Sequence, residues 1–141
     1  MNKYAELKKK HSEENNTLPL KAAFGDEQFE KMMKEWGLTT SKENLMKIRS
    51  LGCGAFCLAS DVYLFEEMRK RHDKEILELI KTDEGLKDAF MYEFANHECG
   101  YTYNPEEAVL ALGITMRDVR NNIFIKPVFD KAWKEYLDRC E

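Results

Sequence analysis

The sequence lacks long apolar runs and has little proline or glycine. Three prolines and seven glycines are spread over 141 residues, so strong helix breakers are rare. No stretch is apolar over the roughly 20 residues that a membrane-spanning helix needs, and the N-terminal MNKYAELKKK has no apolar signal-peptide core. We therefore expect a cytoplasmic protein that does not contact a membrane.

The sequence also lacks a strong excess of charge of either sign. Its 22 basic and 26 acidic residues give a net charge of −4, whereas nucleic-acid-binding domains usually carry a basic face. It contains no G-x-S-x-G elbow, no phosphate-binding P-loop and no Rossmann fingerprint. These absences favour a non-enzymatic protein with no catalytic residue, cofactor or metal, and they make nucleic acid the less favoured partner.

What the sequence does contain is helical patterning. With 43% hydrophobic residues, the chain is long enough to bury one core, and we expect a single domain over 1–141. Apolar residues recur at helical spacing. The fold class should therefore be mostly α, a single compact bundle of six or seven helices, with one short β-hairpin allowed near 48–58. The longest predicted helices cover about 3–15, 61–81, 86–98 and 127–140.

Capping patterns predict where several helices begin. Residues 104–107 (Asn-Pro-Glu-Glu) supply an asparagine cap, a proline at the first helical position and a glutamate at the third. Thr115 with Asp118, and Thr40 with Glu43, fit capping boxes. The short helix after Thr40 is expected to carry Leu45, Ile48 and Leu51.

The densest chemistry lies at the end of the predicted 86–98 helix. Asn96, His97 and Glu98 close that helix, and Tyr101 and Tyr103 follow in a polar turn. Aromatic side chains on ordered loops are enriched at interfaces. Adjacent residues on a helix point about 100° apart, so His97 and Glu98 do not form an acid–base pair by themselves. We expect these five residues to form a binding site.

A second candidate segment surrounds Gly52 and Gly54. Two glycines one residue apart permit backbone angles that other residues resist, which predicts a tight turn or hairpin. The pair alone is not a phosphate loop, because the glycine and lysine of such a loop do not follow it. We include Gly52, Gly54 and Asp61 among the expected binding residues.

Cysteine and histidine residues raise the alternative of a zinc site. Cys53-x3-Cys57 and His97-x-Cys99 together contain a known zinc ligand set, but neither has the usual C-x2-C spacing. The simpler interpretation is two buried thiols and a helix-end turn. The sequence leaves open whether the two pairs converge, and we expect a metal-free protein.

His72 lies on the apolar stripe of the predicted 61–81 helix, near Glu75. A buried imidazole needs a hydrogen-bond partner. Iron or manganese sites in helical bundles use several Glu-x-x-His units, and here only the reverse order, His72-x-x-Glu75, occurs. We therefore interpret His72 as a core histidine that holds two helices together.

Residues 106–122 have the helix–glycine–helix rhythm of a helix-turn-helix motif. Its second helix would carry Arg117 and Arg120, which could touch DNA. A glycine-linked helix pair is nevertheless common in α proteins, and the flanks are acidic. Packing is the favoured interpretation, and a DNA-binding regulator stays as the alternative.

A set of motifs spread along the chain carries a resemblance to known sequences. They are Leu18-Pro19-Leu20, Ala23-Phe24-Gly25-Asp26-Glu27-Gln28-Phe29, Lys47-Ile48-Arg49-Ser50-Leu51-Gly52, Ser60-Asp61, Arg71-His72, Glu93-Phe94-Ala95-Asn96-His97-Glu98 with Tyr101, and Ala111-Leu112-Gly113-Ile114-Thr115. Through them the chain resembles an uncharacterised family of small proteins, a domain of unknown function, from Gram-positive gut and rumen bacteria and their phages and mobile elements. The family pattern is richer in glycine where this chain has Cys53 and Ala55, and aromatic where it has Cys99, which implies that the cysteines are peculiar to this protein.

The leading functional hypothesis is a non-enzymatic protein-binding module, monomeric or homodimeric. The resemblance implies a mobile-element context, in which the partner would be a host defence effector, for example a CRISPR effector that the module inhibits. Two alternatives stay open. One is the DNA-binding regulator that uses 106–122, and the other is a small metal- or acid–base-dependent enzyme centred on His97.

Overall fold

A computed structural model describes residues 1–140, and their contacts group into two compact units. The first unit comprises residues 1–12 and the described residues from 73 onward, and the second comprises 13–72. Each unit is described by itself. The expectation of one domain over 1–141 stays a prediction.

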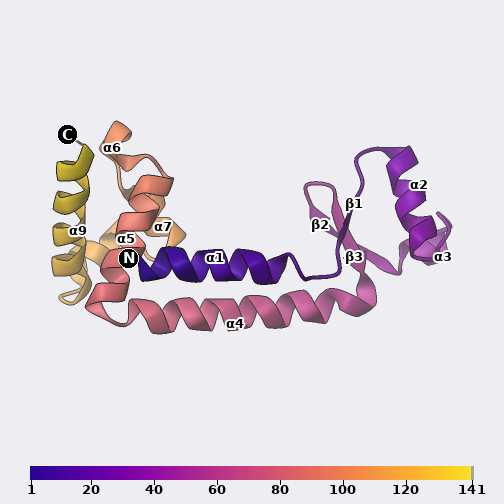
Figure 1. The fold of residues 1–141 in the computed structure, drawn as a ribbon, viewed down its shortest axis with the longest axis horizontal. Coiled ribbons are helices and arrows are strands. Elements are labelled where there is room, and N and C mark those ends of the chain that lie inside the picture. Colours follow the sequence, from indigo (N-terminus) through magenta and orange to yellow (C-terminus); the bar gives the residue numbers. More distant parts are fainter. Residues whose placement is uncertain (141) are drawn as a thin grey trace. The chain divides into compact units, whose positions relative to one another are not determined.

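Helices dominate the described residues, as the sequence predicted. They account for 68% of the structure in nine α-helices, five of which have seven residues or more. The count exceeds the expected six or seven because short helices, such as four-residue α6, occur within connections. The helices are α1 (Lys3–Asn15), α2 (Asp26–Glu35), α3 (Lys42–Leu45), α4 (Val62–Ile80), α5 (Asp83–Asn96), α6 (Cys99–Thr102), α7 (Glu106–Ala111), α8 (Met116–Asn121) and α9 (Ile125–Cys140), with a short 3-10 helix, η1, at Ala59–Asp61 (Figure 1).

The second unit contains a small antiparallel sheet. Strands β2 (Ile48–Gly52) and β3 (Ala55–Leu58) form the hairpin expected near 48–58, and β1 (Lys21–Ala22) pairs with β3 on its other side (Figure 1). A two-residue strand has too little pattern to be predicted. The core of this unit joins the sheet to α2 through Met32, Met33 and Ile48.

Two local predictions in this region were wrong. The side chain that caps α3 is Ser41, which accepts a hydrogen bond from the Asn44 amide, and not Thr40. The helix also ends at Leu45, so Ile48 and Leu51 belong to β2 instead of the helix. A β-branched residue such as Ile48 favours the extended strand.

The core of the first unit forms where α5 packs against α9. Phe94 on α5 meets Phe129 and Trp133 of α9 edge-to-face, with ring centroids 5.7 and 5.0 Å apart. Such pairs add to the free energy gained by burying their area. Ala108 and Val109 of α7 are fully buried in the same core, as is Phe90. The capping box predicted for Thr115 and Asp118 is present at the start of α8.

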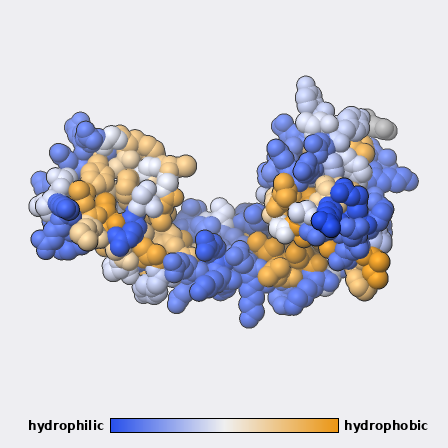
Figure 2. All heavy atoms as spheres, turned by 180° about the vertical axis from the view of Figure 1, so that it is seen from behind, coloured by the Kyte–Doolittle hydropathy of each residue, from blue (hydrophilic) through white to orange (hydrophobic). Residues whose placement is uncertain are grey.

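Both units expose some apolar surface between their charged side chains (Figure 2). Among the described residues, no helix is both long and apolar enough to cross a membrane.

Gly85 provides a test of the junction between α4 and α5. A Cβ at Gly85 would lie 2.0 Å from the Leu79 carbonyl oxygen, a backbone atom that cannot move aside cheaply. We expect Gly85→Ala to lower the free energy of unfolding by about 2–3 kcal/mol, the range of core overpacking. Chemical denaturation with circular dichroism would measure it.

The matched control is Gly113→Ala. Gly113 has a left-handed backbone, φ +79°, but nothing lies within 4 Å of its added Cβ. Only backbone strain of about 1 kcal/mol should result. If both variants lost the same free energy of unfolding, the contact with the Leu79 carbonyl would not constrain the junction between α4 and α5.

Candidate functional site

The expected binding segment forms a short, tightly held turn, which we call the aromatic turn (residues 97–103). Helix α5 ends at Asn96, and His97 is its C-terminal cap. Glu98 and Tyr103, which flank α6, both adopt left-handed backbone angles, with φ 51° and 55°. Left-handed conformations are unfavourable for residues other than glycine, and they persist where surrounding contacts impose them.

His97 lies between two carboxylates. Its Nε2 is 3.2 Å from Oε2 of Glu93, one turn earlier on α5, and its Nδ1 is 3.8 Å from Oε2 of Glu107 on α7. The two carboxylates differ in environment, because the Glu93 side chain is 4% exposed and that of Glu107 is 81% exposed. The contact with Glu93 is therefore the better shielded from solvent.

Glu93 is a carboxylate within the apolar core of the first unit. Its second oxygen, Oε1, accepts a hydrogen bond of 3.0 Å from the hydroxyl of Tyr4 on α1. Burial, together with the neighbouring Glu93 charge, raises the pKa of Tyr4 far above its ordinary value, so this hydroxyl stays a donor. Tyr4, Glu93 and His97 thus form one connected polar network, which stabilises a charge that would otherwise be costly to bury.

A second set of contacts anchors α6 to α9. The Gly100 amide donates a 3.2 Å hydrogen bond to the Tyr136 hydroxyl, and a Cβ at Gly100 would lie 2.5 Å from the Cys140 sulfur. Cys99 is fully buried, and burial raises the pKa of its thiol, which keeps it protonated and poorly nucleophilic. A shallow groove of about 620 Å³ lies here, lined by Ala95, Glu98, Gly100, Tyr101, Tyr136 and Cys140.

Four of the five binding residues predicted at the end of α5 and in the aromatic turn face solvent. Asn96 and Glu98 are exposed, and Tyr101 and Tyr103 retain 90% and 73% of their accessible surface. His97 is half-buried and lies at the base of the turn. The structure thus brings these five predicted residues into one segment of the first unit.

The other three predicted residues belong to the second unit. Gly52 and Gly54 form the β2–β3 turn with φ +88° and +80°, as the spacing predicted. A Cβ at Gly54 would lie 2.4 Å from the ring of Phe24, so this glycine also allows close packing. Asp61 ends η1, immediately before α4.

The four residues of the zinc alternative are divided between the units. Cys53 and Cys57 lie in the second unit, and Cys99 and His97 lie in the first. Cys53 is exposed, whereas Cys57 is fully buried. Burial, followed by the charge of Asp61, raises the pKa of the Cys57 thiol, which makes it a poorer metal ligand at neutral pH.

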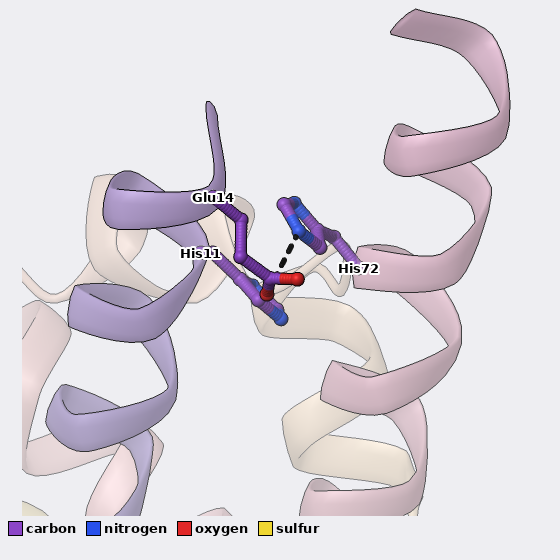
Figure 3. A group of neighbouring side chains, drawn as sticks. All are labelled: His11, Glu14 and His72. Atoms are coloured by element: carbon purple, nitrogen blue, oxygen red, sulfur yellow. Dashed lines mark ion pairs between the residues drawn. The ribbon is translucent and has the colours of Figure 1, made fainter. Parts of the chain in front are cut away.

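His72 is buried, as its position on the apolar stripe predicted, and it points to a carboxylate. Its Nε2 lies 3.5 Å from Oε1 of Glu14, and Figure 3 shows the two side chains facing each other from α4 and α1. Glu75, which the sequence placed beside His72, lies 3.5 Å from Nε2 of His11 in the first unit. His11 is buried as well.

Residues 106–122 pack as the favoured interpretation predicted. Ala108, Leu112 and Val119 are buried, and Arg117 and Arg120 are exposed.

Sequence reasoning missed Glu93 and Tyr4. Glu93 carries a usable signal, because it lies four residues before His97 and beside the apolar stripe of the helix. Tyr4 is 89 residues away from Glu93, and no local pattern links them.

Comparison with known proteins identifies a family without assigning a role. Residues 3–135 match the family described as "Family of unknown function (DUF7659)". Neither the curated proteins nor the solved structures contain a match to this chain.

The network around Glu93 predicts unequal effects for two substitutions. His97→Ala removes the imidazole beside Oε2 of the buried Glu93 carboxylate and leaves it only the Tyr4 hydroxyl, so we expect a loss of about 1–3 kcal/mol in the free energy of unfolding. Glu107→Gln removes only the exposed partner of His97, and it should cost less than about 0.5 kcal/mol. Urea denaturation of the two variants beside the wild type measures both values. If His97→Ala were as stable as Glu107→Gln, the network would not support the turn.

Proposed function

The chain belongs to this family of unknown function, and we propose that it is a non-enzymatic protein-binding module that uses the aromatic turn of its first unit. The observation that carries the proposal is the exposure of Tyr101 and Tyr103 on a segment whose backbone is held by buried contacts. Exposed tyrosines on a rigid support are typical of binding hot spots, since they offer large contact area at low entropic cost.

A second loop of the same unit, before the N-terminal end of α9, also exposes large apolar side chains. Ile123 and Phe124, between α8 and α9, are 79% and 76% exposed. The Asn122 side chain accepts hydrogen bonds from the amides of Phe124 and Ile125, which fixes this loop at the start of α9. Two ordered loops of the first unit therefore present large apolar side chains to solvent, where a partner could cover them.

The two alternatives have weaker support. The helix with Arg117 and Arg120 has six residues and carries Asp118, whose pKa is lowered by hydrogen bonds from Thr115, so a negative charge stays on the proposed DNA-reading face. Both ring nitrogens of His97 face carboxylates, which favours a structural role over acid–base chemistry on a substrate.

We further propose that the partner is a bacterial defence protein, such as a CRISPR effector, which the module inhibits in the cytoplasm. The support is the resemblance to small proteins of Gram-positive bacteria, phages and mobile elements. Monomers or homodimers would present the aromatic turn equally well.

The double variant Tyr101→Ala/Tyr103→Ala tests the proposed surface. Because both side chains are exposed, folding should change by less than about 0.5 kcal/mol. Partner capture should fall at least tenfold, since hot-spot tyrosines contribute about 2 kcal/mol or more. Quantitative cross-linking in a Gram-positive host, followed by mass spectrometry and titration of the purified partner, measures the change.

Tyr63→Ala is the matched control, because Tyr63 is an exposed tyrosine of the second unit, 56% accessible. It should leave partner capture unchanged. Salt-sensitive DNA binding that is abolished by Arg117→Glu/Arg120→Glu and retained in the tyrosine variant would replace the proposal with the DNA-binding alternative.

A further inference from the structure

We propose that the groove beside the aromatic turn binds an arginine side chain that a protein partner presents. The groove, about 620 Å³ in volume, lies where α6 packs against the end of α9, and its described lining residues all belong to the first unit (Figure 1). This assignment rests on the protein-binding function proposed above, to which it adds the chemical class of the group that the partner inserts.

Much of the groove wall is apolar or already hydrogen-bonded. Ala95 offers only a methyl group, and the Tyr136 hydroxyl accepts the hydrogen bond of the Gly100 amide. The methylene stem of a long cationic side chain can therefore pack there without leaving a buried polar group unpaired. The volume also falls within the roughly 300–1,000 Å³ that is typical of pockets for small organic groups.

Glu98 gives the groove its charge. Among the described lining residues it supplies the one carboxylate, and none of them is a lysine or an arginine. Its side chain is exposed and takes part in no ion pair among the described residues of the first unit, whereas Glu135 on α9 is paired with Lys87 and Arg139. Both Glu98 oxygens are therefore available to a guanidinium group, which binds a carboxylate through two parallel hydrogen bonds.

The chain around the aromatic turn is acidic. Residues 89–116 contain four glutamates and no lysine or arginine, although the whole chain has 22 basic and 26 acidic residues. Three of these glutamates, Glu98, Glu106 and Glu107, are exposed, and the histidine of this stretch already faces two carboxylates. Such a surface attracts a cationic partner and repels an anionic one.

Tyr101 favours arginine over lysine as the cation. It lines the groove and is 90% exposed, so its ring is accessible to an incoming group. A cation over the face of a tyrosine ring is attracted by the ring, and the planar, weakly hydrated guanidinium also stacks on it. A carboxylate and an aromatic ring in one groove match the two interactions that arginine combines at binding hot spots.

The backbone at Glu98 is an independent observation. Glu98 and Tyr103 are the two residues other than glycine with left-handed angles among the described residues of the first unit. Glycine adopts such angles at little cost, yet the chain has glutamate at the position that lines the groove. Strained residues are concentrated at binding and catalytic sites, and a carboxylate used for recognition would account for the strain here.

A titration followed by nuclear magnetic resonance tests the assignment. The probe is a short peptide with blocked ends and one central arginine, added to the isotope-labelled full chain. We expect saturable shifts of the Glu98, Gly100 and Tyr101 amides at millimolar peptide. The same peptide with citrulline, which keeps the shape of arginine but lacks its charge, should bind about tenfold more weakly. The lysine peptide should bind more weakly than the arginine peptide.

Three variants assign the contacts. Glu98→Gln should weaken binding of the arginine peptide about tenfold, and Tyr101→Ala about threefold. Glu6→Gln removes an exposed carboxylate from α1 in the same unit, and as the matched control it should bind as the wild type does. The assignment would be overturned by equal binding of the citrulline peptide, by wild-type affinity in Glu98→Gln, or by the lack of saturable shifts at the groove.

Glu98→Gly keeps the test valid against a general loss of stability. Because glycine adopts left-handed angles readily, the melting temperature of this variant should equal or exceed that of the wild type. Its affinity for the arginine peptide should nevertheless fall about tenfold. A carboxylate that only supported the fold would give the opposite pair of results, a lower melting temperature with unchanged affinity.

Two results separate this assignment from the protein-binding function. If the purified partner binds Tyr101→Ala/Tyr103→Ala weakly but binds Glu98→Gln as tightly as the wild type, the protein-binding function stands and the arginine assignment is overturned. If the arginine peptide needs Glu98 but partner capture is unchanged in the double tyrosine variant, the groove binds arginine and the protein-binding function of the turn fails.

Discussion

Burial of the Glu93 carboxylate is the constraint on which the first unit depends. Moving an ionised carboxylate out of water costs several kcal/mol unless partners compensate it. Tyr4 supplies a hydroxyl donor from α1, and His97 supplies an imidazole from the end of α5. The requirement to satisfy one charge therefore fixes the position of α1 against α5, and it fixes the point at which the aromatic turn leaves the helix.

The elements that the sequence predicted well are those with local causes. The capping box of Thr115 and Asp118 lies within four residues, and the glycines of the β2–β3 turn adopt the angles that their spacing predicted. The misplaced residues Ile48 and Leu51 have an apolar spacing that fits a helix, and the pairing of their strand, β2, with β3 overrides it. Such pairing depends on contacts that no short window of sequence contains.

The candidate site was predictable only in part, for the same reason. The exposed residues of the aromatic turn are adjacent in sequence, and their chemistry identified them. The residues that hold the turn, Tyr4 and Tyr136, come from opposite ends of the chain and meet it only in the folded unit. A buried glutamate four residues before a histidine is the one local signal that could have pointed to the supporting network.

The left-handed backbone at Glu98 and Tyr103 has a consequence for the rate at which a partner would bind the aromatic turn. A segment held in unfavourable angles by packed neighbours has lost its conformational entropy when the chain folds, so little remains to be lost at an encounter. A partner would then meet tyrosines whose backbone positions are already set. Association with such a surface is limited by diffusion and orientation instead of by loop ordering, and affinity differences between partners should appear mainly in how slowly the complexes separate.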